Sequence, residues 1–333
     1  DVVLSRGLGD VYKRQIDASI IGLGTWATGV DADEKSSIQI IHGALDAGVT
    51  LIDTAPSYGW GRSEEIVGRA IRGRRDQVVL ATKCGIWWAD ARGSASGKKD
   101  GKDIYVCIDP ATIRLEVEAS LKRLKVDTLD LLQVHRPALE PDKMPVADTM
   151  GCLMDLKREG KIRAIGVSNV NLDQLTEYQS FGCVDSNQLR YNMLNREAEA
   201  EALAHCHDHN IAAMTYTSLE QGLLTGKVTP DRSYEESDWR RNAGQWMPWF
   251  KEHNLKKLLE VFTGWDDLLE SYDATIPQLV VAWTASRPHA THVLCGSRSV
   301  PQVQENALGG GLRLTGRDIE RMTLDLDKLG APR

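Results

Sequence analysis

The sequence has few cysteines and no long hydrophobic run. Its six cysteines form no Cys-x-x-Cys pair and are widely spaced, at Cys84, Cys107, Cys152, Cys183, Cys206 and Cys295. This spacing is typical of thiols in a reducing compartment and argues against a disulfide framework. No apolar stretch approaches the ~18 residues that a membrane helix needs. We therefore expect a cytoplasmic protein without a membrane partner.

The chain also lacks an excess of basic charge. Lys and Arg number 40 against 47 for Asp and Glu, and the net charge is −7. That balance argues against a nucleic-acid partner. A Rossmann fingerprint is missing too, because the short motif Gly22-Leu-Gly24 has no third glycine at the required spacing.

One segment has the composition of a metal site. His205 and His209 lie four residues apart in His205-Cys-His-Asp-His209, a spacing that brings two imidazoles to one face of a helix. However, the segment ends a helical pattern, where histidine interacts favourably with the helix dipole. We therefore expect no metal in this protein.

What the sequence does contain is a regular alternation of strand-like and helical patterns. The 333 residues are 42% hydrophobic and 26% charged, as in an ordinary globular domain. Eight strand-like runs occur, at 19–23, 50–53, 78–83, 128–135, 164–168, 184–188, 212–217 and 291–295. Amphipathic patterns lie between them, among them 34–47, 112–124, 146–158 and 196–207. The alternation predicts an α/β fold, a single (β/α)8 TIM barrel.

Three longer connections interrupt this alternation. They are residues 85–109, residues 219–254 and a tail after Ala307, in which 315–326 is expected to form a helix on the barrel exterior. Loops that follow strands lie on the catalytic face of such a barrel, and long ones commonly cover the pocket.

Four polar residues lie at or just after the ends of these strand-like runs. Asp53, Lys83 and His135 each end a run, and Tyr58 lies in the loop after Asp53. The carboxyl ends of parallel strands share one end of a barrel, so we expect these four groups to meet there. An ammonium beside a phenol favours the phenolate and lowers the pKa of the tyrosine. We expect Asp53 to hold Lys83 charged.

This set predicts carbonyl reduction. Tyr58 would protonate a carbonyl oxygen that His135 orients, while a nicotinamide delivers hydride. A metal-dependent barrel hydrolase would need His or carboxylate pairs at several strand ends, and only Asp53 and His135 qualify.

Several motifs give the chain a specific resemblance from about Ala18 to its end. They are 21–26 (Ile-Gly-Leu-Gly-Thr-Trp), 51–59 (Leu-Ile-Asp-Thr-Ala-Pro-Ser-Tyr-Gly), 81–83 (Ala-Thr-Lys), 134–137 (Val-His-Arg-Pro), 160–169 and 222–227. The sequence resembles the aldo-keto reductase superfamily, in particular the bacterial general-stress and inositol-operon types. The resemblance implies a TIM barrel, an NADPH cofactor and the tetrad Asp53, Tyr58, Lys83 and His135. Another reading is a non-catalytic NADPH-binding sensor, as in the potassium-channel beta subunits that share the fold.

A phosphate site is expected late in the chain. Residues 295–306 read as a strand end, a turn and the start of a helix, where backbone N–H groups favour a phosphate and Arg298 adds a matching fork. The resemblance implies that Gly296, Ser297 and Arg298 meet an adenosine 2′-phosphate. It implies ribose or adenine contacts for Gln302, Glu305 and Asn306.

Further cofactor residues are expected at other strand ends. The resemblance implies that Ser168, Asn169 and Gln188 hold the nicotinamide carboxamide and that Tyr216 stacks on its ring. Gly24, Thr25, Trp26 and Asp53 are also expected to contact the nicotinamide end of the cofactor. The pyrophosphate is expected to follow Ser218, Leu219, Gly222, Leu223 and Lys227. One of Arg232, Arg240 and Arg241 closes over the cofactor, and the sequence does not choose among them.

The substrate pocket is expected to be rich in aromatic residues. A small carbonyl compound would contact Trp26, Tyr58, Trp60, Trp87, Trp88, His135 and Arg136. Many relatives carry tryptophan after the catalytic histidine, whereas this chain has Arg136, which favours a polar or anionic substrate. The sequence leaves open the physiological substrate, the direction of reaction and the oligomeric state.

The first residues do not read as native protein. Residues 5–15 can be written in codons as the DNA of a transposase-based sequencing adapter. We therefore expect residues 1–15 to be a translated artefact, followed by a single barrel domain over 16–333 that lacks its native N-terminal hairpin. The alternative is a natural disordered terminus.

Overall fold

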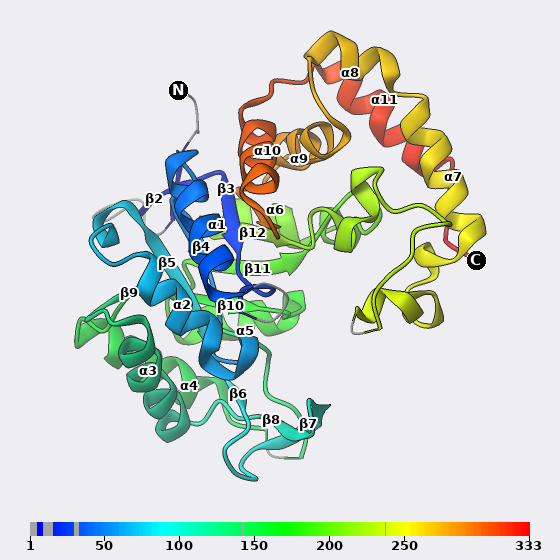
Figure 1. The fold of residues 1–333 in the computed structure, drawn as a ribbon. Helices are drawn as coiled ribbons and strands as arrows, with labels where there is room; N and C mark the ends of the chain where they lie inside the picture. The colour runs from blue at the N-terminus through cyan, green and yellow to red at the C-terminus, as the bar shows by residue number, and fades with distance from the viewer. Residues whose placement is uncertain (1–4, 9–15, 30–32, 142, 237) are drawn as a thin grey trace.

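A computed structural model describes residues 5–8, 16–29, 33–141, 143–236 and 238–333 (Figure 1). Eight parallel strands close into a barrel in the order β10-β11-β12-β13-β3-β4-β5-β9. Their bounds are β3 (Ile21–Gly24), β4 (Leu51–Asp53), β5 (Val79–Cys84), β9 (Leu129–Val134), β10 (Ile162–Ser168), β11 (Ser186–Arg190), β12 (Ala212–Tyr216) and β13 (His292–Gly296). The predicted (β/α)8 barrel is confirmed, and each of the eight expected runs supplies one strand.

Helices surround these strands. They are α1 (Glu34–Asp46), α2 (Arg62–Ala70), α3 (Pro110–Leu124), α4 (Val146–Arg158), α5 (Leu172–Phe181), α6 (Ala202–Asp208), α9 (Ile276–Ser286) and α10 (Val300–Gly311). Side-chain caps mark several starts: Asp33, Asp109, Asn171, Thr275 and Ser299 each accept a backbone N–H of the first turn.

The prediction of one helix over residues 196–207 is wrong in its first half. Residues Glu197–Glu199 form a separate 3₁₀ turn, η3, and α6 begins only at Ala202. The break falls at Glu201, whose φ of −144° is not helical. Glu199 accepts hydrogen bonds from Tyr191 and Arg287, so tertiary contacts hold this turn apart from the helix.

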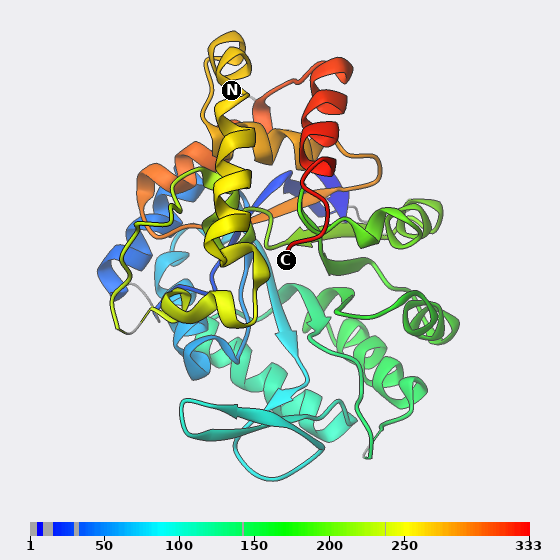
Figure 2. The same cartoon turned by 90° about the vertical axis from the view of Figure 1, so that its right-hand side faces the viewer.

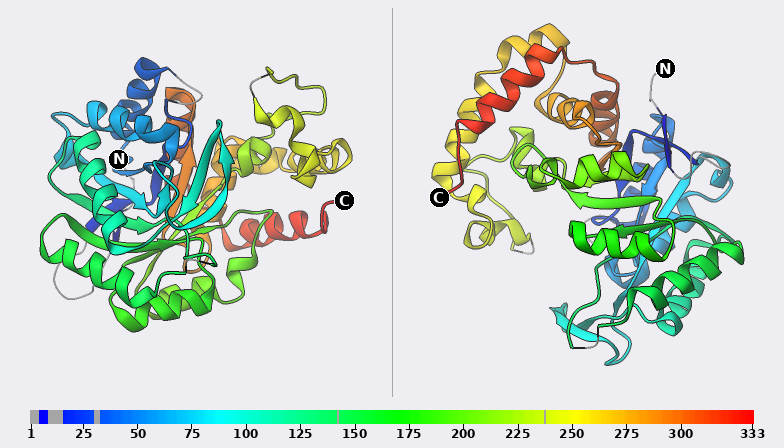
Figure 3. Two further views of the ribbon diagram at one scale, coloured as in Figure 1. Left: turned by 90° about the horizontal axis from the view of Figure 1, so that it is seen from below. Right: turned by 180° about the vertical axis from the view of Figure 1, so that it is seen from behind.

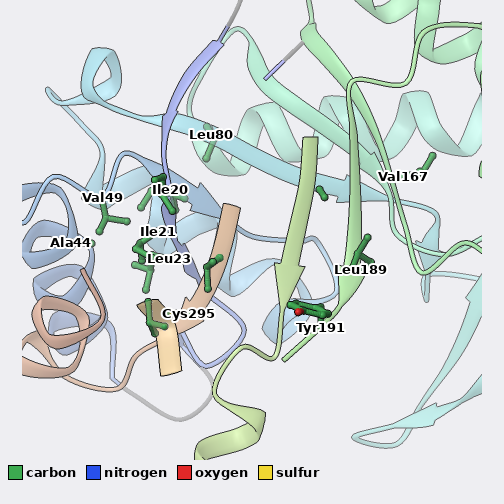
Figure 4. Packing of buried hydrophobic residues seen from close by; sticks show 14 of the residues in the cluster. Ile20, Ile21, Leu23, Ala44, Val49, Leu80, Val167, Leu189, Tyr191 and Cys295 are labelled. Atoms are coloured by element: carbon green, nitrogen blue, oxygen red, sulfur yellow. The ribbon is translucent and has the colours of Figure 1, made fainter. Parts of the chain in front are cut away.

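Alternation along the strands builds two apolar layers. Leu51, Val79 and Ala81 belong to a cluster inside the barrel. Ile52 and Leu80 belong instead to the larger layer between strands and helices. Figure 4 shows Leu80 among other residues of that layer. Successive strand residues face opposite sides, so each strand contributes to both layers.

A short hairpin lies at the amino-terminal end of the barrel. Strand β2 (Ile16–Ser19) contributes Ile16 and Ala18 to the interior cluster. It pairs antiparallel with β1 (Ser5–Leu8). Residues 1–4 and 9–15 lie outside the described residues, and the non-native origin of residues 1–15 stays a prediction.

The connection 85–109 contains a small sheet that the sequence did not predict. Strands β6 (Ile86–Trp87), β8 (Lys102–Val106) and β7 (Ser94–Lys99) pair antiparallel in that order. Figure 2 shows this sheet, in cyan, just beyond the carboxyl end of β5. This small sheet is therefore an additional structured segment at the carboxyl end of the barrel strands, where the polar residues lie.

The connection 219–254 and the tail build a separate layer of helices. Three 3₁₀ turns, η4 (Glu220–Thr225), η5 (Trp239–Gln245) and η6 (Pro248–Phe250), lead into α7 (Glu252–Thr263) and α8 (Asp266–Tyr272). The tail helix α11 (Gly316–Asp327) lies beside α7 and α8 (Figures 1 and 3).

The expected tail helix thus exists, but most of its polar contacts are with α8 and the residue that precedes it. Trp265 donates to Asp325 and Tyr272 donates to Asp318. A bond from Trp283 of α9 to Thr323 ties the layer to the barrel helices. Within the described residues, no helix is both long enough and apolar enough to cross a membrane.

Asp130 is a buried junction of the barrel. Its carboxylate is 2% exposed, accepts the Leu80 N–H at 2.8 Å and pairs with Arg75 at 2.7 Å and Arg163 at 2.6 Å. We expect Asp130→Ala to lower the unfolding free energy by about 2–3 kcal/mol, because a buried N–H loses its acceptor. Urea unfolding followed by circular dichroism measures this.

The matched control is Asp46→Ala, which removes an exposed pair with Arg74. Exposed pairs contribute less than about 1 kcal/mol. Equal losses in the two variants would contradict the role assigned to Asp130.

Candidate active site

The four predicted residues meet at the carboxyl end of the barrel around a buried lysine. Lys83, at 1% exposure, donates from Nζ to Asp53 Oδ2 at 2.6 Å and to Tyr58 Oη at 3.2 Å. A third bond reaches the Thr54 carbonyl at 3.0 Å. Burial disfavours the ammonium, but Asp53 and Tyr58 outweigh it and raise the pKa of Lys83. Lys83 is therefore a fixed positive charge beneath the phenol.

Two amides complete the shell of Asp53. Gln133 of β9 and Gln188 of β11 donate to Asp53 Oδ1 at 3.0 and 2.9 Å. Both glutamines are buried. The sequence analysis did not predict Gln133, because it lies within the strand-like run 129–134 and not at its end. The signal that could have revealed it is a polar residue at a position of that strand that faces the barrel interior. The carboxylate is thus satisfied on both oxygens, as a buried charge requires.

Tyr58 reaches the site through a tight turn. It opens η1 (Tyr58–Gly61), in which Gly59, Trp60 and Gly61 all have positive φ. Burial raises the pKa of the Tyr58 phenol, although Lys83 opposes that rise. The expected lowering by the ammonium is therefore wrong in net direction, because burial is the larger effect. The phenol keeps its proton at neutral pH.

His135 lies across from the phenol. The rings of Tyr58 and His135 are 6.0 Å apart and nearly perpendicular, at 82°. Burial and the positive charges of Lys83 and Arg136 lower the pKa of His135 well below its usual value. A neutral imidazole retains one N–H, so His135 is able to donate a hydrogen bond to an uncharged oxygen.

Glu116 supports this histidine from behind and was also missed in the sequence. Its Oε2 accepts the backbone N–H of Gly85 at 2.6 Å. The carbonyl of the same peptide, Cys84 O, accepts the backbone N–H of His135 at 2.9 Å. Burial raises the pKa of Glu116 well above its usual value. One peptide plane is thus held between α3 and the end of β9.

The side chains expected at the carboxamide form a chain of hydrogen bonds. Ser168 donates to the Gln188 carbonyl at 2.9 Å, and Asn169 donates to the His135 carbonyl at 2.9 Å. Tyr216 donates to Asn169 Oδ1 at 2.6 Å. These residues therefore line the site next to His135. Thr25 is tied to the same region by its bond to the Asp53 carbonyl, at 3.0 Å.

The loop after β12 has an unusual backbone. Thr217, Glu220, Gln221 and Gly222 all have positive φ, and Gly222 reaches 96°. The Glu220 N–H bonds the Thr217 carbonyl at 2.7 Å and the Gly222 N–H bonds the Leu219 carbonyl at 2.9 Å, so these turns are closed by hydrogen bonds within the loop. Ser218 is buried and donates to the Leu294 carbonyl at 3.0 Å, which ties this loop to β13.

The expected phosphate region is the start of α10. Ser299 caps the helix, Gln302 accepts the Arg298 N–H at 2.8 Å, and Asn306 donates to Ser297 at 3.2 Å. Glu305 pairs with Lys227 of the preceding loop at 3.2 Å. The structure thus brings Lys227, which was expected at the pyrophosphate, next to Glu305, which was expected at the ribose or adenine.

The aromatic residues divide into two groups. The Trp60 and Trp88 rings contact at 5.4 Å. Trp87 instead donates to Asp90 and lies under Arg92.

The histidines of the segment 205–209 are on α6 and at its end, where His205 contacts Gln179 and His209 bonds the His205 carbonyl. Within the described part of the chain, no group of three or more potential ligands is placed to hold a metal.

These features define a (β/α)8-barrel protein with a polar site at the carboxyl ends of its strands. A model of the Aldo/keto reductase family matches residues 20–323. The chain is 40% identical over 314 residues to an Escherichia coli (strain K12) protein named NADH-specific methylglyoxal reductase, covering 92% of this chain and 94% of that one. The chain therefore belongs to the aldo-keto reductase family, and the resemblance is confirmed.

Solved structures agree with this assignment. The glycerol dehydrogenase from Gluconobacter oxydans superposes with a TM-score of 0.85 and 32% identity, covering 99% of this chain and 96% of that one. An aldo/keto reductase from Klebsiella pneumoniae, solved in complex with NADP and acetate, gives a TM-score of 0.70 and 27% identity over 96% and 94% of the two chains.

The lowered pKa of His135 predicts a pH effect on stability. The unfolded chain takes up this proton near pH ~6.5, whereas the folded protein resists it until lower pH. Stability is therefore complete above that value and is lost as the pH falls toward the folded pKa. We expect the wild type to lose more unfolding free energy than His135→Gln between about pH 7.5 and 5.5. Parallel losses in the two proteins, measured by urea unfolding, would contradict this.

Proposed function

We propose that this protein is an NADPH-dependent reductase that converts aldehydes or ketones to alcohols. The observation that carries the proposal is the position of Lys83 Nζ, bonded to both Asp53 and Tyr58. Lys83 donates to the phenol oxygen, so the Tyr58 hydrogen is directed elsewhere, toward a substrate oxygen. Tyr58 is then the general acid, and the same ammonium stabilises the phenolate that its proton leaves behind.

His135 and Asp53 have supporting roles in this proposal. Neutral His135 donates a hydrogen bond to the carbonyl oxygen and orients it between the imidazole and the phenol. Asp53 holds the Lys83 charge in place, and its own position is set by Gln133 and Gln188. A nicotinamide supplies the hydride when it is bound.

The residues proposed to bind that cofactor carry the kinds of groups that its parts would need. Ser168, Asn169 and Gln188 offer amide and hydroxyl groups beside the tetrad, and Tyr216 offers a ring face. The loop that ends at Gly222 is proposed to follow the pyrophosphate, where the absence of a side chain at Gly222 lets the backbone approach the cofactor. The residues proposed for adenosine and its 2′-phosphate are Gly296, Ser297, Arg298, Gln302, Glu305 and Asn306.

Among the three arginines of the loop 219–254, we propose Arg240 as the cofactor contact. Its guanidinium is held by Asp238 at 2.5 Å and stacks on Tyr234 at 4.9 Å. A Cβ on Gly222 would lie 3.8 Å from Arg240 Nη1, so the charge adjoins the proposed pyrophosphate loop. Arg232 and Arg241 are turned to the Lys227 carbonyl and to Glu236.

Replacement of the acid tests the reaction. We expect Tyr58→Phe to lower kcat by at least about 100-fold, because the proton donor is lost. The dissociation constant for NADPH should change by less than about twofold, since the phenol acts on substrate. Stopped-flow turnover and cofactor fluorescence measure the two quantities.

The control is Tyr272→Phe, which removes a hydroxyl bonded to Asp318 on the distant helical layer. It should retain turnover. An unaltered rate in Tyr58→Phe would overturn the assignment of the acid.

Cofactor choice is tested at Arg298. The E. coli relative is named for NADH, whereas a guanidinium at the start of α10 favours a 2′-phosphate. We expect Arg298→Ala to weaken NADPH binding by roughly tenfold or more and to leave NADH binding nearly unchanged. Arg313→Ala, an exposed arginine just past α10, is the control. Equal losses for both cofactors would overturn the assignment of Arg298 to the 2′-phosphate.

A further inference from the structure

We propose that the pocket recognises carbonyl substrates that carry a carboxylate, through a cationic rim formed by Lys99, Lys102 and Arg136. This inference rests on the proposed reductase function and names its substrate class. It is carried by the placement of three cationic side chains around the tryptophans and the histidine of the site.

The tip of the β7–β8 hairpin lies on the pocket tryptophans. Lys99 Nζ is 5.7 Å from the Trp26 ring, and Lys102 Nζ is 4.8 Å from the Trp60 ring. Trp60 also donates to Asp100 at 3.2 Å, within the turn of the hairpin. Both lysine charges are therefore held over the catalytic-face loops by aromatic contacts.

The turn itself fixes these two lysines side by side. Lys99 and Lys102 are direct cross-strand partners, and the two residues between them, Asp100 and Gly101, both have positive φ. This is the tight two-residue hairpin geometry that sets strand register. Like charges directly opposite each other are unfavourable in a sheet. An anion bound near both ammonium groups would relieve that repulsion.

Arg136 supplies the third charge, from the tetrad side of the pocket. It follows His135 directly, is exposed, and has no carboxylate within 4 Å among the described residues. Its positive charge adds to the effects of burial and Lys83, which together lower the pKa of His135. The nearby Arg190 differs, because Glu220 neutralises it.

The hairpin also carries two acids, Asp100 and Asp103. Asp103 is paired with Lys98 at 3.1 Å. Asp100 is the acid of the turn and is bonded to Trp60. Among the described residues, the contacts of this hairpin with Trp26 and Trp60 thus involve two cations, Lys99 and Lys102, and one acid, Asp100. A carboxylate is the complement, and the guanidinium fork matches its two oxygens.

The test compares aldehydes with and without an anionic group. NADPH oxidation is measured with 4-oxobutanoate against butanal, and with glyceraldehyde 3-phosphate against glyceraldehyde. We expect kcat/KM for 4-oxobutanoate to exceed that for butanal by roughly tenfold, mostly through KM, as one charge-assisted contact supplies. This preference should shrink as salt is raised.

Variants locate the effect. Arg136→Gln should bring the ratio of the two kcat/KM values close to one, and the double variant Lys99→Gln/Lys102→Gln should lower it by a few-fold. Lys98→Gln is the matched control, since it removes a lysine of the same hairpin that Asp103 already pairs, and the ratio should stay as in the wild type.

The outcomes separate this inference from the function on which it rests. Turnover of butanal without preference for 4-oxobutanoate would overturn the carboxylate rim and leave the reductase intact. A preference for the phosphorylated substrate alone would overturn the carboxylate as the recognised group. Absence of turnover on all four compounds, with NADPH bound, would overturn the proposed function and this inference together.

Discussion

The buried ion pair between Lys83 and Asp53 is the constraint on which the rest of the site depends. A charge inside a protein is stable only when it is paired and fully hydrogen-bonded. Here the ammonium has three oxygen partners, and the carboxylate has Lys83 on one oxygen and two glutamines on the other. β4, β5, β9 and β11 each supply a member of this cluster. Barrel closure and charge satisfaction therefore require the same strand ends to meet.

That arrangement also explains why the ionisation states around the pair differ. Burial keeps the proton on Tyr58, and burial together with the nearby cations lowers the pKa of His135 and keeps it neutral. The site thus presents two uncharged donors above a permanent cation, which suits an oxygen that becomes negative as it reacts. Glu116, whose burial favours its neutral form, supports His135 through a shared peptide without adding a negative charge nearby.

Much of this was readable from the sequence, because eight strand-like runs alternate with helical patterns and three tetrad residues end such a run. What was not readable depends on tertiary contacts. The sheet β6–β8 arises from a segment rich in Gly, Ser and Lys with weak strand propensity, which pairs with itself over the catalytic face. The break before α6 follows from contacts that Tyr191 and Arg287 make with Glu199. The direction of the Tyr58 pKa depends on burial, which local sequence does not report.

The unpredicted sheet is also what extends the site beyond the tetrad. In the proposed reaction, the groups at the strand ends act on a carbonyl and do not distinguish what is attached to it. Selectivity must come from residues farther out, and the hairpin turn at residues 99–102 is the part of this sheet that contacts the pocket tryptophans. A rigid two-residue turn presents its flanking side chains with little loss of entropy on binding. In the proposed reaction, positive charge at the rim and the Lys83 cation at the centre would act in the same direction: the rim would bind the anionic end of a substrate, and Lys83 would stabilise the negative charge that develops at the other end.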